Sequence, residues 1–152
     1  MEISGKRLRL RDIQEKDRAS LTHWLHPRHE WHKTNGPYYP RSQPDEIPEI
    51  VGKWIASDLS GVRRRLLITS NEADDIIGLV SRYWISQETN WSAIGIVIYD
   101  ESHWGQGLGY EALGLWCDYL LAANPDWVRL ALRTWSGNYG MLKLAENLGF
   151  VC

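Results

Sequence analysis

Three alternate glycines, Gly105, Gly107 and Gly109, stand between a strand-like segment and a helix-like segment. The β-branched run before them ends near Tyr99, and helical spacing of apolar residues begins at about Leu108. Glycine loses more backbone freedom on folding than any other residue, so three in one short loop indicate that the chain needs room or an unusual backbone conformation there. This strand-to-helix loop constrains the fold and the chemistry more than any other feature.

The loop has the properties of a pyrophosphate cradle. The first N–H groups of a helix have no intrahelical acceptor, and the positive end of the helix dipole lies behind them. Glycines allow the backbone to approach a bound anion closely. On local chemistry alone, a plain glycine-rich connection is the alternative.

Two other phosphate-binding motifs fit less well. Residues 107–112 formally match GxGxxA, but a Rossmann motif opens a parallel βαβ unit and is followed about twenty positions later by an acidic residue. Here the preceding strands read as antiparallel, and Arg129 and Arg133 occupy that window. No Gly-Lys-Ser/Thr follows the glycines, which excludes a P-loop.

The other segments predict a mixed α/β fold. Period-two alternation predicts strands over residues 6–13, 62–69, 76–83, 91–99 and 128–134, and helical spacing predicts helices over 13–25, 44–57, 108–123 and 138–148. Gly149 is expected to end the last helix in a left-handed turn, with Phe150 folding back against it. The order of elements predicts a mixed, largely antiparallel central sheet with helices on both faces.

Length and composition place the chain among ordinary globular domains. Its 152 residues fit a single domain, 1–152, and 43% of them are hydrophobic. The formal net charge of −2 gives no global field that would attract nucleic acid or an anionic membrane. Two cysteines without a CxxC pair support neither a disulfide framework nor a zinc ribbon.

Neither a secretory leader nor a membrane span is expected. No apolar stretch follows the charges of residues 1–12, and no eighteen consecutive residues are apolar. The sequence therefore predicts a cytoplasmic protein with no membrane partner.

Two motifs make the chain resemble the GNAT superfamily of acyl-CoA-dependent N-acetyltransferases. The family's loop, Arg/Gln-x-x-Gly-x-Gly/Ala, aligns with residues 104–109, where Trp104 replaces the usual first residue. The second signature, Asn-x-x-Ala-x-x-x-Tyr-x-x-x-Gly-Phe, aligns with residues 138–150, and its Asn and Gly-Phe match at the right spacing. Trp followed by Gly-x-Gly and then Glu111-Ala112 is similar to the ribosomal-protein N-terminal acetyltransferase branch.

The resemblance implies the GNAT fold and transfer of an acetyl group from acetyl-CoA, the co-substrate, to a primary amine on a protein N-terminus or a small molecule. The amine would attack the thioester directly in a ternary complex, which requires positioning and carbonyl polarisation rather than a covalent protein nucleophile. Strand 91–99 would splay from strand 128–134 and pair its backbone with the pantetheine arm. The implied cofactor-binding residues are Ile96, Val97, Ile98, Trp104, Gly105, Gln106, Gly107, Leu108, Gly109, Tyr110 and Asn138.

The chain also departs from the family. Ala145 stands where many members have a tyrosine that protonates the departing thiolate, and strand 91–99 lacks the glutamate that some relatives use as a general base. Ser92 is the polar side chain nearest to the position of that missing glutamate. Tyr139 is a candidate substitute for the acid, and the alternative is that it lies in the core or at its rim, as a tyrosine on a helix usually does. The catalytic residues stay unassigned. A non-catalytic acyl-CoA-binding module of the same fold is the alternative, and a nucleotide-binding regulatory domain is a weaker one.

The loop between the first two helices is expected to build the acceptor side. Its candidate substrate-binding residues are Trp31, His32, Tyr38 and Tyr39, with His29 beside them. Histidines recur every three residues from His23 to His32, but Pro27 interrupts the helix that would align them, so no metal site is predicted. The run of arginines at 63–65 could reach a phosphate, although such a run is usually a solvated face.

The end of the chain carries one further expectation. Family members normally continue past Gly-Phe with a final strand pair, whereas only Val151 and Cys152 follow here, so the domain reads as truncated. Strand 128–134 would then form an unprotected edge, and an exposed apolar edge favours pairing with another chain. The sequence thus predicts a homo-oligomer formed through this edge.

Overall fold

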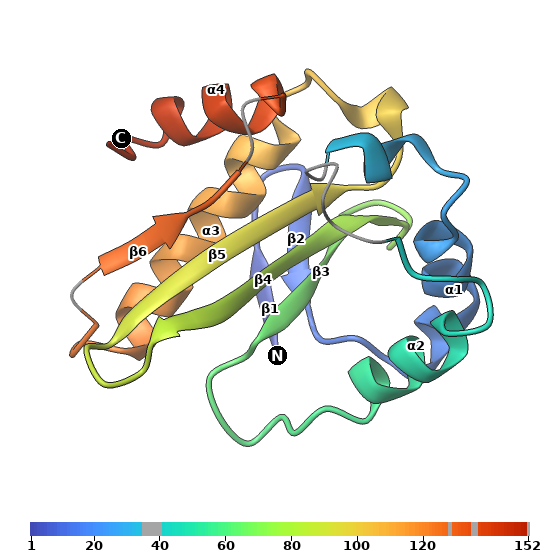
Figure 1. The fold of residues 1–152 in the computed structure, drawn as a ribbon, viewed down its shortest axis with the longest axis horizontal. Coiled ribbons are helices and arrows are strands. Elements are labelled where there is room, and N and C mark those ends of the chain that lie inside the picture. Colours follow the sequence, from blue (N-terminus) through green and yellow to red (C-terminus); the bar gives the residue numbers. More distant parts are fainter. Residues whose placement is uncertain (35–40, 128, 135–136, 152) are drawn as a thin grey trace.

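Six strands form one sheet in the computed structural model, which describes residues 1–34, 41–127, 129–134 and 137–151. The strands, in chain order and also in sheet order, are β1 (Glu2–Ser4), β2 (Leu8–Arg11), β3 (Arg65–Ser70), β4 (Ile76–Ser86), β5 (Trp91–Ile98) and β6 (Arg129–Leu132). Neighbours from β1 to β5 pair antiparallel, and β5 pairs parallel with β6. The sheet crosses the centre of the molecule in Figure 1.

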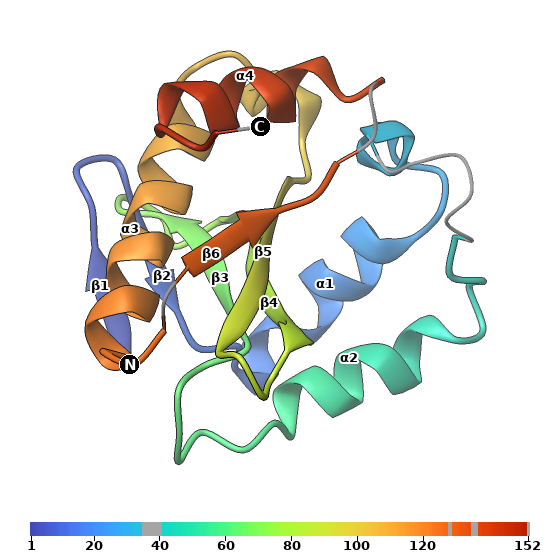
Figure 2. The same cartoon turned by 60° about the vertical axis from the view of Figure 1, so that its left-hand side comes forward.

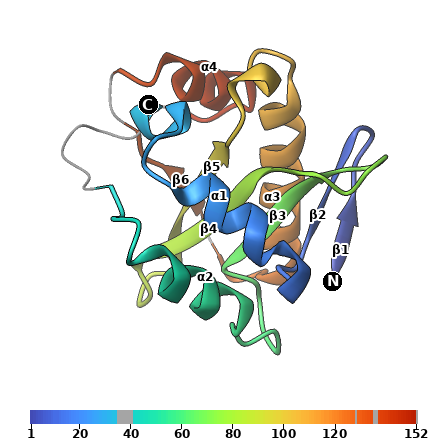
Figure 3. The same cartoon turned by 90° about the vertical axis from the view of Figure 1, so that its right-hand side faces the viewer.

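Within the described residues, four α-helices and three short 3₁₀ helices surround the sheet. The α-helices are α1 (Arg18–Leu25), α2 (Ile47–Ile55), α3 (Leu108–Ala123) and α4 (Tyr139–Asn147), and the 3₁₀ helices are η1 (Glu15–Asp17), η2 (Glu30–Thr34) and η3 (Glu101–His103). Helices α1 and α2 lie on one side of the sheet, and α3 and α4 lie on the other (Figures 2 and 3). This arrangement is the mixed, largely antiparallel sheet with helices on both faces that the sequence predicts.

Each face of the sheet has its own hydrophobic core. Alternation along β5 sends Ile94 into the cluster under α3 and Val97 and Tyr99 into the cluster under α1 and α2. Trp116 of α3 is fully buried, and its indole Nε1 donates to the carbonyl of Ser81 at 3.0 Å. The sheet thus forms the middle layer between two packed helical layers.

The observed elements differ from the predicted ones mainly at their N-terminal ends. Strand 6–13 is confirmed as β2, but the sequence missed β1, a short strand that pairs with it. Helix 13–25 begins only at Arg18, because the carboxylate of Asp17 accepts from the backbone N–H of Gln14 and ends a 3₁₀ turn there.

The predicted strand 62–69 begins at Arg65 for a similar reason. The guanidinium of Arg63 donates to the carbonyls of Leu59 and Gly61 and to the carboxylate of Asp12, which folds this segment into a loop. Arg63 is therefore an internal ion-pair partner and not part of a solvated run.

The last two elements are shorter than predicted: β6 ends at Leu132 instead of residue 134, and α4 spans Tyr139–Asn147 within the predicted 138–148. Val128 lies outside the described residues, and β6 covers Arg129–Leu132 of the predicted strand 128–134. Gly149 has φ +89°, and Phe150 packs against the core under α3, as the sequence predicts for the end of α4.

One carboxylate ties together the N-terminal strands, η1 and the β3–β4 turn. Asp74, itself at φ 58°, accepts from Arg9 at 2.8 Å, from Arg11 at 2.9 Å and from Lys16 at 2.7 Å. Arg11 also pairs with Asp17 at 2.8 Å. The hydrogen bond from Arg11 is the main reason that the pKa of Asp74 lies far below its usual value, and those from Lys16 and Arg9 add to it against the opposing effect of burial.

We expect Asp74→Asn to lower the free energy of unfolding by about 1–3 kcal/mol at pH 7, because asparagine accepts the left-handed backbone but removes the carboxylate that Arg9, Arg11 and Lys16 share. Arg9 then keeps only Glu2 and Arg11 only Asp17, while Lys16 has no carboxylate partner among the described residues. A depressed folded-state pKa contributes stability above the unfolded-state pKa of about 3.9, and that contribution is lost as the pH falls below it. The difference between variant and wild type should therefore shrink from pH 7 to pH 3 in urea titrations.

The control is Asp75→Asn, because Asp75 is the neighbouring exposed carboxylate and forms no ion pair with any of the described residues. Equal losses in the two variants, or a loss for Asp74→Asn that is the same at both pH values, would contradict the assignment.

Candidate acetyl-CoA site

The segment from the end of β5 to the start of α3 forms the glycine loop. Gly105 has φ +74° and Gly107 has φ +79°, so both adopt the left-handed backbone that side chains disfavour. The first hydrogen bond of α3 runs from the N–H of Glu111 to the carbonyl of Gly107 at 3.2 Å. The N–H groups of the three residues before Glu111 begin the helix without an intrahelical acceptor. The loop therefore has the backbone geometry of an anion cradle.

The three glycines have different roles. A Cβ built at Gly105 would meet nothing within 4 Å, so the space beside it is open. A Cβ at Gly109 would lie 3.4 Å from a methyl of Leu144 and 4.0 Å from a methyl of Ile96, which makes this glycine a packing contact between α3, α4 and β5. The open space expected for a ligand is thus beside Gly105, whereas a Cβ at Gly107 would lie 3.3 Å from Nη2 of Arg7.

Arg7, from the turn between β1 and β2, holds the glycine loop from behind. Its Nη1 donates to the carbonyl of Gln106 at 2.7 Å, and its Nε donates to Glu111 Oε1 at 3.2 Å. Glu111 Oε2 accepts from the backbone N–H groups of Arg7 at 3.0 Å and Leu8 at 3.3 Å. We call this group, formed by Arg7, Gln106 and Glu111, the loop clasp.

The loop clasp keeps Glu111 ionised. Burial raises the pKa of Glu111, but the hydrogen bonds from Arg7 and Leu8 outweigh it and leave the pKa below its usual value. Gly5 contributes by its lack of a side chain, because a Cβ there would lie 2.5 Å from Glu111 Oε2. No local pattern predicts this contact, because Arg7 and Glu111 stand 104 positions apart.

The edge of β5 that faces β6 opens beyond Ile94. Parallel pairing joins the two strands from Trp91 opposite Arg129 to Ile94 opposite Leu132. The three residues predicted to pair with pantetheine, Ile96, Val97 and Ile98, lie beyond that stretch and pair only with β4 among the described strands.

On the β4 side, β5 lies tightly against Gly78. A Cβ built at Gly78 would overlap the carbonyl of Val97, so only glycine allows this approach of the two backbones. Gly78 therefore fixes the position of the strand whose other edge is open.

The other predicted loop residues surround the cradle. The indole Nε1 of Trp104 donates to the carbonyl of Ile98 at 2.9 Å, which ties the loop to the end of β5. The side-chain amide of Gln106 donates to the carbonyl of Ser102 at 2.7 Å. On the first turn of α3, the side chain of Tyr110 is half-exposed and that of Leu108 is buried. The structure thus brings the predicted cradle residues together in one place.

Asn138 is fully engaged within the protein. Its Oδ1 accepts from the N–H of Met141 at 3.2 Å and caps α4, and its Nδ2 donates to the carbonyl of Thr34 at 3.0 Å. The side chain therefore joins α4 to η2, and a contact with the CoA arm stays a prediction.

Two of the predicted acceptor residues, Trp31 and His32, are buried. Trp31 and His32 are 8% and 7% exposed, with ring centroids 3.7 Å apart. The indole of Trp31 donates to the carbonyl of Trp24, and a ring nitrogen of His32 lies 3.0 Å from the carbonyl of His26. These contacts make both residues part of the scaffold.

The other predicted acceptor residues, Tyr38 and Tyr39, lie outside the described residues.

Two histidines of this region, His29 and His32, are at least partly buried. Burial lowers the pKa of His32, and it lowers the pKa of His29 as well. Among the described residues, no group of three His, Cys, Asp or Glu side chains could hold a metal ion.

The structure adds little polar chemistry beside the open edge of β5. Ser92 is buried, and its hydroxyl donates to the carbonyl of Tyr83 at 3.0 Å. Tyr139 is 79% exposed on α4. The hydroxyl of Tyr99, which is 2% exposed, has no hydrogen-bond partner among the described residues, and burial raises the pKa of Tyr99.

Comparison with known proteins gives the family of this fold. Residues 7–151 match the family described as "Acetyltransferase (GNAT) domain". The chain belongs to the GNAT family of acetyltransferases. The family therefore implies acetyl-CoA-dependent acetyl transfer as the general activity. A search among curated proteins finds no match.

Several solved structures share the fold of this GNAT domain. The ribosomal-protein-S5-alanine acetyltransferase of Vibrio fischeri has a TM-score of 0.78 and 18% identity, over 99% of this chain and 83% of that one. The ribosomal L7/L12 α-N-protein acetyltransferase RimL, solved with coenzyme A, has a TM-score of 0.78 and 19% identity, over 98% and 83%. A chimeric spermidine N-acetyltransferase from Vibrio cholerae has a TM-score of 0.69 and 22% identity, over 96% and 81%.

We expect Gly107→Val to weaken CoA binding about tenfold or more. A valine at φ +79° is strained, its Cβ would lie 3.3 Å from Nη2 of Arg7, and the resulting shift would move the N–H groups of the cradle. Isothermal titration with CoA measures the effect.

The matched control is Gly61→Val, because a Cβ at Gly61 meets nothing within 4 Å and the residue lies in an irregular loop before β3. A folded Gly107→Val protein with unchanged CoA affinity would rule out the cradle.

Proposed function

We propose that this GNAT domain transfers the acetyl group of acetyl-CoA to a primary amine, with a protein N-terminus or a small amine as acceptor. The observation that carries the proposal is the cradle at Gly105 and Gly107 beside an open edge of β5. The two features together would hold the phosphate end and the pantetheine arm of one CoA molecule.

The chain's own part in the reaction is mainly positioning. The loop clasp would hold the cradle in place while its N–H groups bind pyrophosphate. The backbone of Ile96, Val97 and Ile98 would align the thioester arm, and Trp104 would keep the cradle at a fixed distance from that strand.

The transfer itself is a direct displacement. The amine nitrogen forms a bond to the carbonyl carbon, the carbon–sulfur bond breaks, the sulfur leaves as thiolate, and the nitrogen loses one proton. Because strand β5 carries no carboxylate and Ala145 replaces the family's tyrosine, the proton goes to solvent or to the CoA thiolate in this proposal.

The same two departures favour one alternative, a domain that binds acyl-CoA without turning it over. We expect acetyl-CoA and CoA to bind in isothermal titration and NAD to fail, and we expect thiol release from acetyl-CoA to rise when an amine is added. The panel should hold peptides with free N-termini, the same peptides with blocked N-termini, and polyamines. Binding without amine-dependent release would overturn the catalytic proposal in favour of the binding module.

We also propose that the domain self-associates through β6. This strand ends the sheet order, and within the described part of the chain only β5 pairs with it. An unpaired edge exposes backbone N–H and C=O groups that can pair with a second chain. Light scattering over a concentration series should show a mass above that of the monomer, and a monomer mass at every concentration would overturn this proposal.

A further inference from the structure

The arginines of this domain fall into two groups. Five of them pair with carboxylates within 4.0 Å: Arg7, Arg9, Arg11, Arg18 and Arg63. All five lie in or beside the N-terminal strands, η1 and the loop before β3. The arginines of the later strands have no carboxylate partner among the described residues.

Three of these later arginines lie on the same face of the sheet, the face that α1 and α2 cover in part. Arg65 of β3 stacks on Trp54 of α2, with its guanidinium carbon 5.0 Å from the ring centroid. Leu130 and Leu132 pack under α3, so alternation places Arg129 and Arg133 on the opposite face. The three arginines, Arg65, Arg129 and Arg133, are called the arginine face below.

The register places this face beside the point where β5 and β6 separate. Arg65 lies opposite Ser81, and Ser81 lies opposite Gly95, in one row across three strands. Gly95 directly follows Ile94, the last residue of β5 that pairs with β6, and Arg133 directly follows the partner of Ile94. Arg65 and Arg133 therefore flank a floor of small residues, and three strand spacings put their backbones about 14 Å apart or slightly more where β5 and β6 separate.

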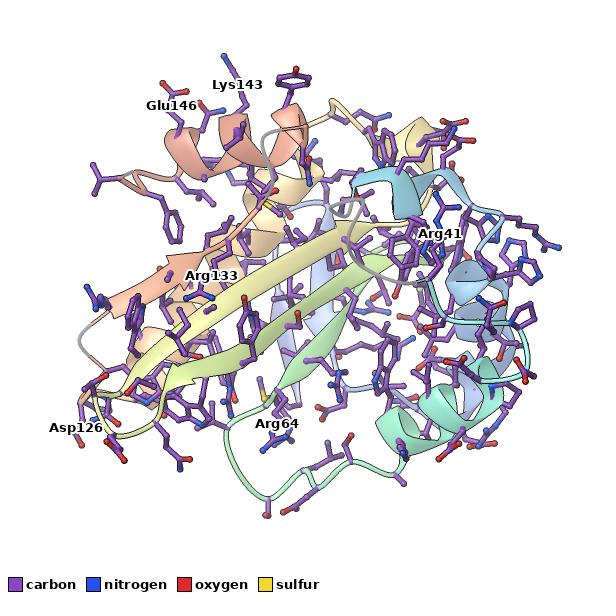
Figure 4. The ribbon with its side chains drawn as sticks, in the orientation of Figure 1. Arg41, Arg64, Asp126, Arg133, Lys143 and Glu146 are labelled. Atoms are coloured by element: carbon purple, nitrogen blue, oxygen red, sulfur yellow. The ribbon has the colours of Figure 1, made fainter. Side chains whose placement is uncertain are left out.

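Figure 4 looks onto this face, with Arg133 beside the end of β6 and Arg64 near the start of β3. The outward-facing positions of β4, β5 and β6 beside the arginines include no Asp or Glu. The undescribed residues, 35–40, 128, 135–136 and 152, also contain no Asp or Glu.

The cations of this face are held without neutralisation. The guanidinium carbon of Arg129 lies 3.8 Å from the ring centroid of Trp91, so an indole and not a carboxylate supports it. Burial lowers the pKa of Arg65, and the nearby charge of Arg64 lowers it further. An anionic group bound here would relieve this unfavourable electrostatic environment.

We propose that the arginine face binds carboxylates of the acceptor, so that the preferred acceptor is the N-terminus of an acidic peptide. This inference rests on the proposed acetyl transfer, since the face adjoins the place where the thioester arm would end. An extended peptide advances about 3.3 Å per residue, so carboxylates about four residues apart would reach from one arginine to the other. A polyamine would meet like charge on the same face.

The test uses three peptides that share their first residue: Ser-Glu-Gly-Gly-Gly-Glu, the same peptide with Gln for Glu, and the same peptide with Lys for Glu. Each carries a fluorophore at its C-terminus, and binding to the CoA-loaded protein is measured by anisotropy. We expect the acidic peptide to bind about tenfold more tightly than the neutral one and the basic peptide to bind most weakly. The difference in affinity between the acidic peptide and the other two should become smaller at high salt, because salt screens the interactions between exposed charges.

Variants then locate the preference. Arg65→Gln and Arg133→Gln should each weaken the acidic peptide about threefold to fivefold, and Arg65→Lys should restore most of the loss. Lys143→Gln removes the same charge from the exposed surface of α4 and should change nothing (Figure 4). Equal binding of the three peptides, or an equal effect of Lys143→Gln, would overturn the inference.

Turnover separates this inference from the function on which it rests. Acidic peptides that bind with the expected preference but do not accelerate CoA release would support the arginine face and contradict acetyl transfer. Amines that are acetylated without regard to charge would support transfer and contradict the arginine face. A hexanucleotide that binds more tightly than the acidic peptide and loses affinity in the same variants would assign the face to nucleic acid instead.

Discussion

The parallel pairing of β5 with β6 determines where the candidate site lies. Two adjacent parallel strands cannot be joined by a tight turn, so the chain must leave the end of β5, cross one face of the sheet and return. Helix α3 makes this crossing, and its N-terminus consequently stands at the end of β5. The same pair separates after four registered positions, which leaves a strand edge free next to that helix end. The crossover thus places the N-terminus of α3 at the end of β5, and the separation of the two strands places an open edge beside it.

The loop clasp shows how a distant part of the chain supports this arrangement. A glycine loop alone is free to adopt many conformations, and glycines at φ +74° and +79° have no side chains to hold them. Arg7 and Glu111 supply the missing restraint through one carboxylate that also accepts from two N–H groups of the β1–β2 turn. The N-terminal hairpin therefore supports the glycine loop, although it contributes no residue to the loop itself.

The sequence predicted the features that depend on local pattern and missed those that depend on long-range contact. Helix α3 agrees with its predicted range of 108–123, and the positive φ angles at Gly105 and Gly107 follow the expected use of glycine. Strand β1 has three residues and no alternation of apolar side chains, so only its pairing with β2 reveals it. The cap that Asn138 forms on α4 is a local contact three residues long, whereas its bond to Thr34 joins segments 104 positions apart and has no sequence signature.

The position of the open edge of β5 depends on Gly78, a residue of the neighbouring strand β4 in the interior of the sheet. Any side chain at this position of β4 would push against the carbonyl of Val97 and displace β5 toward the space that the pantetheine arm would use. A substitution there would therefore resemble a competitive inhibitor in its effect: it would fill part of the ligand's volume with the protein's own backbone while touching no ligand atom. A substitution that weakens CoA binding in such a domain therefore need not lie on the surface of the site. The width of the opening beside β5 depends on β4, the next strand of the sheet.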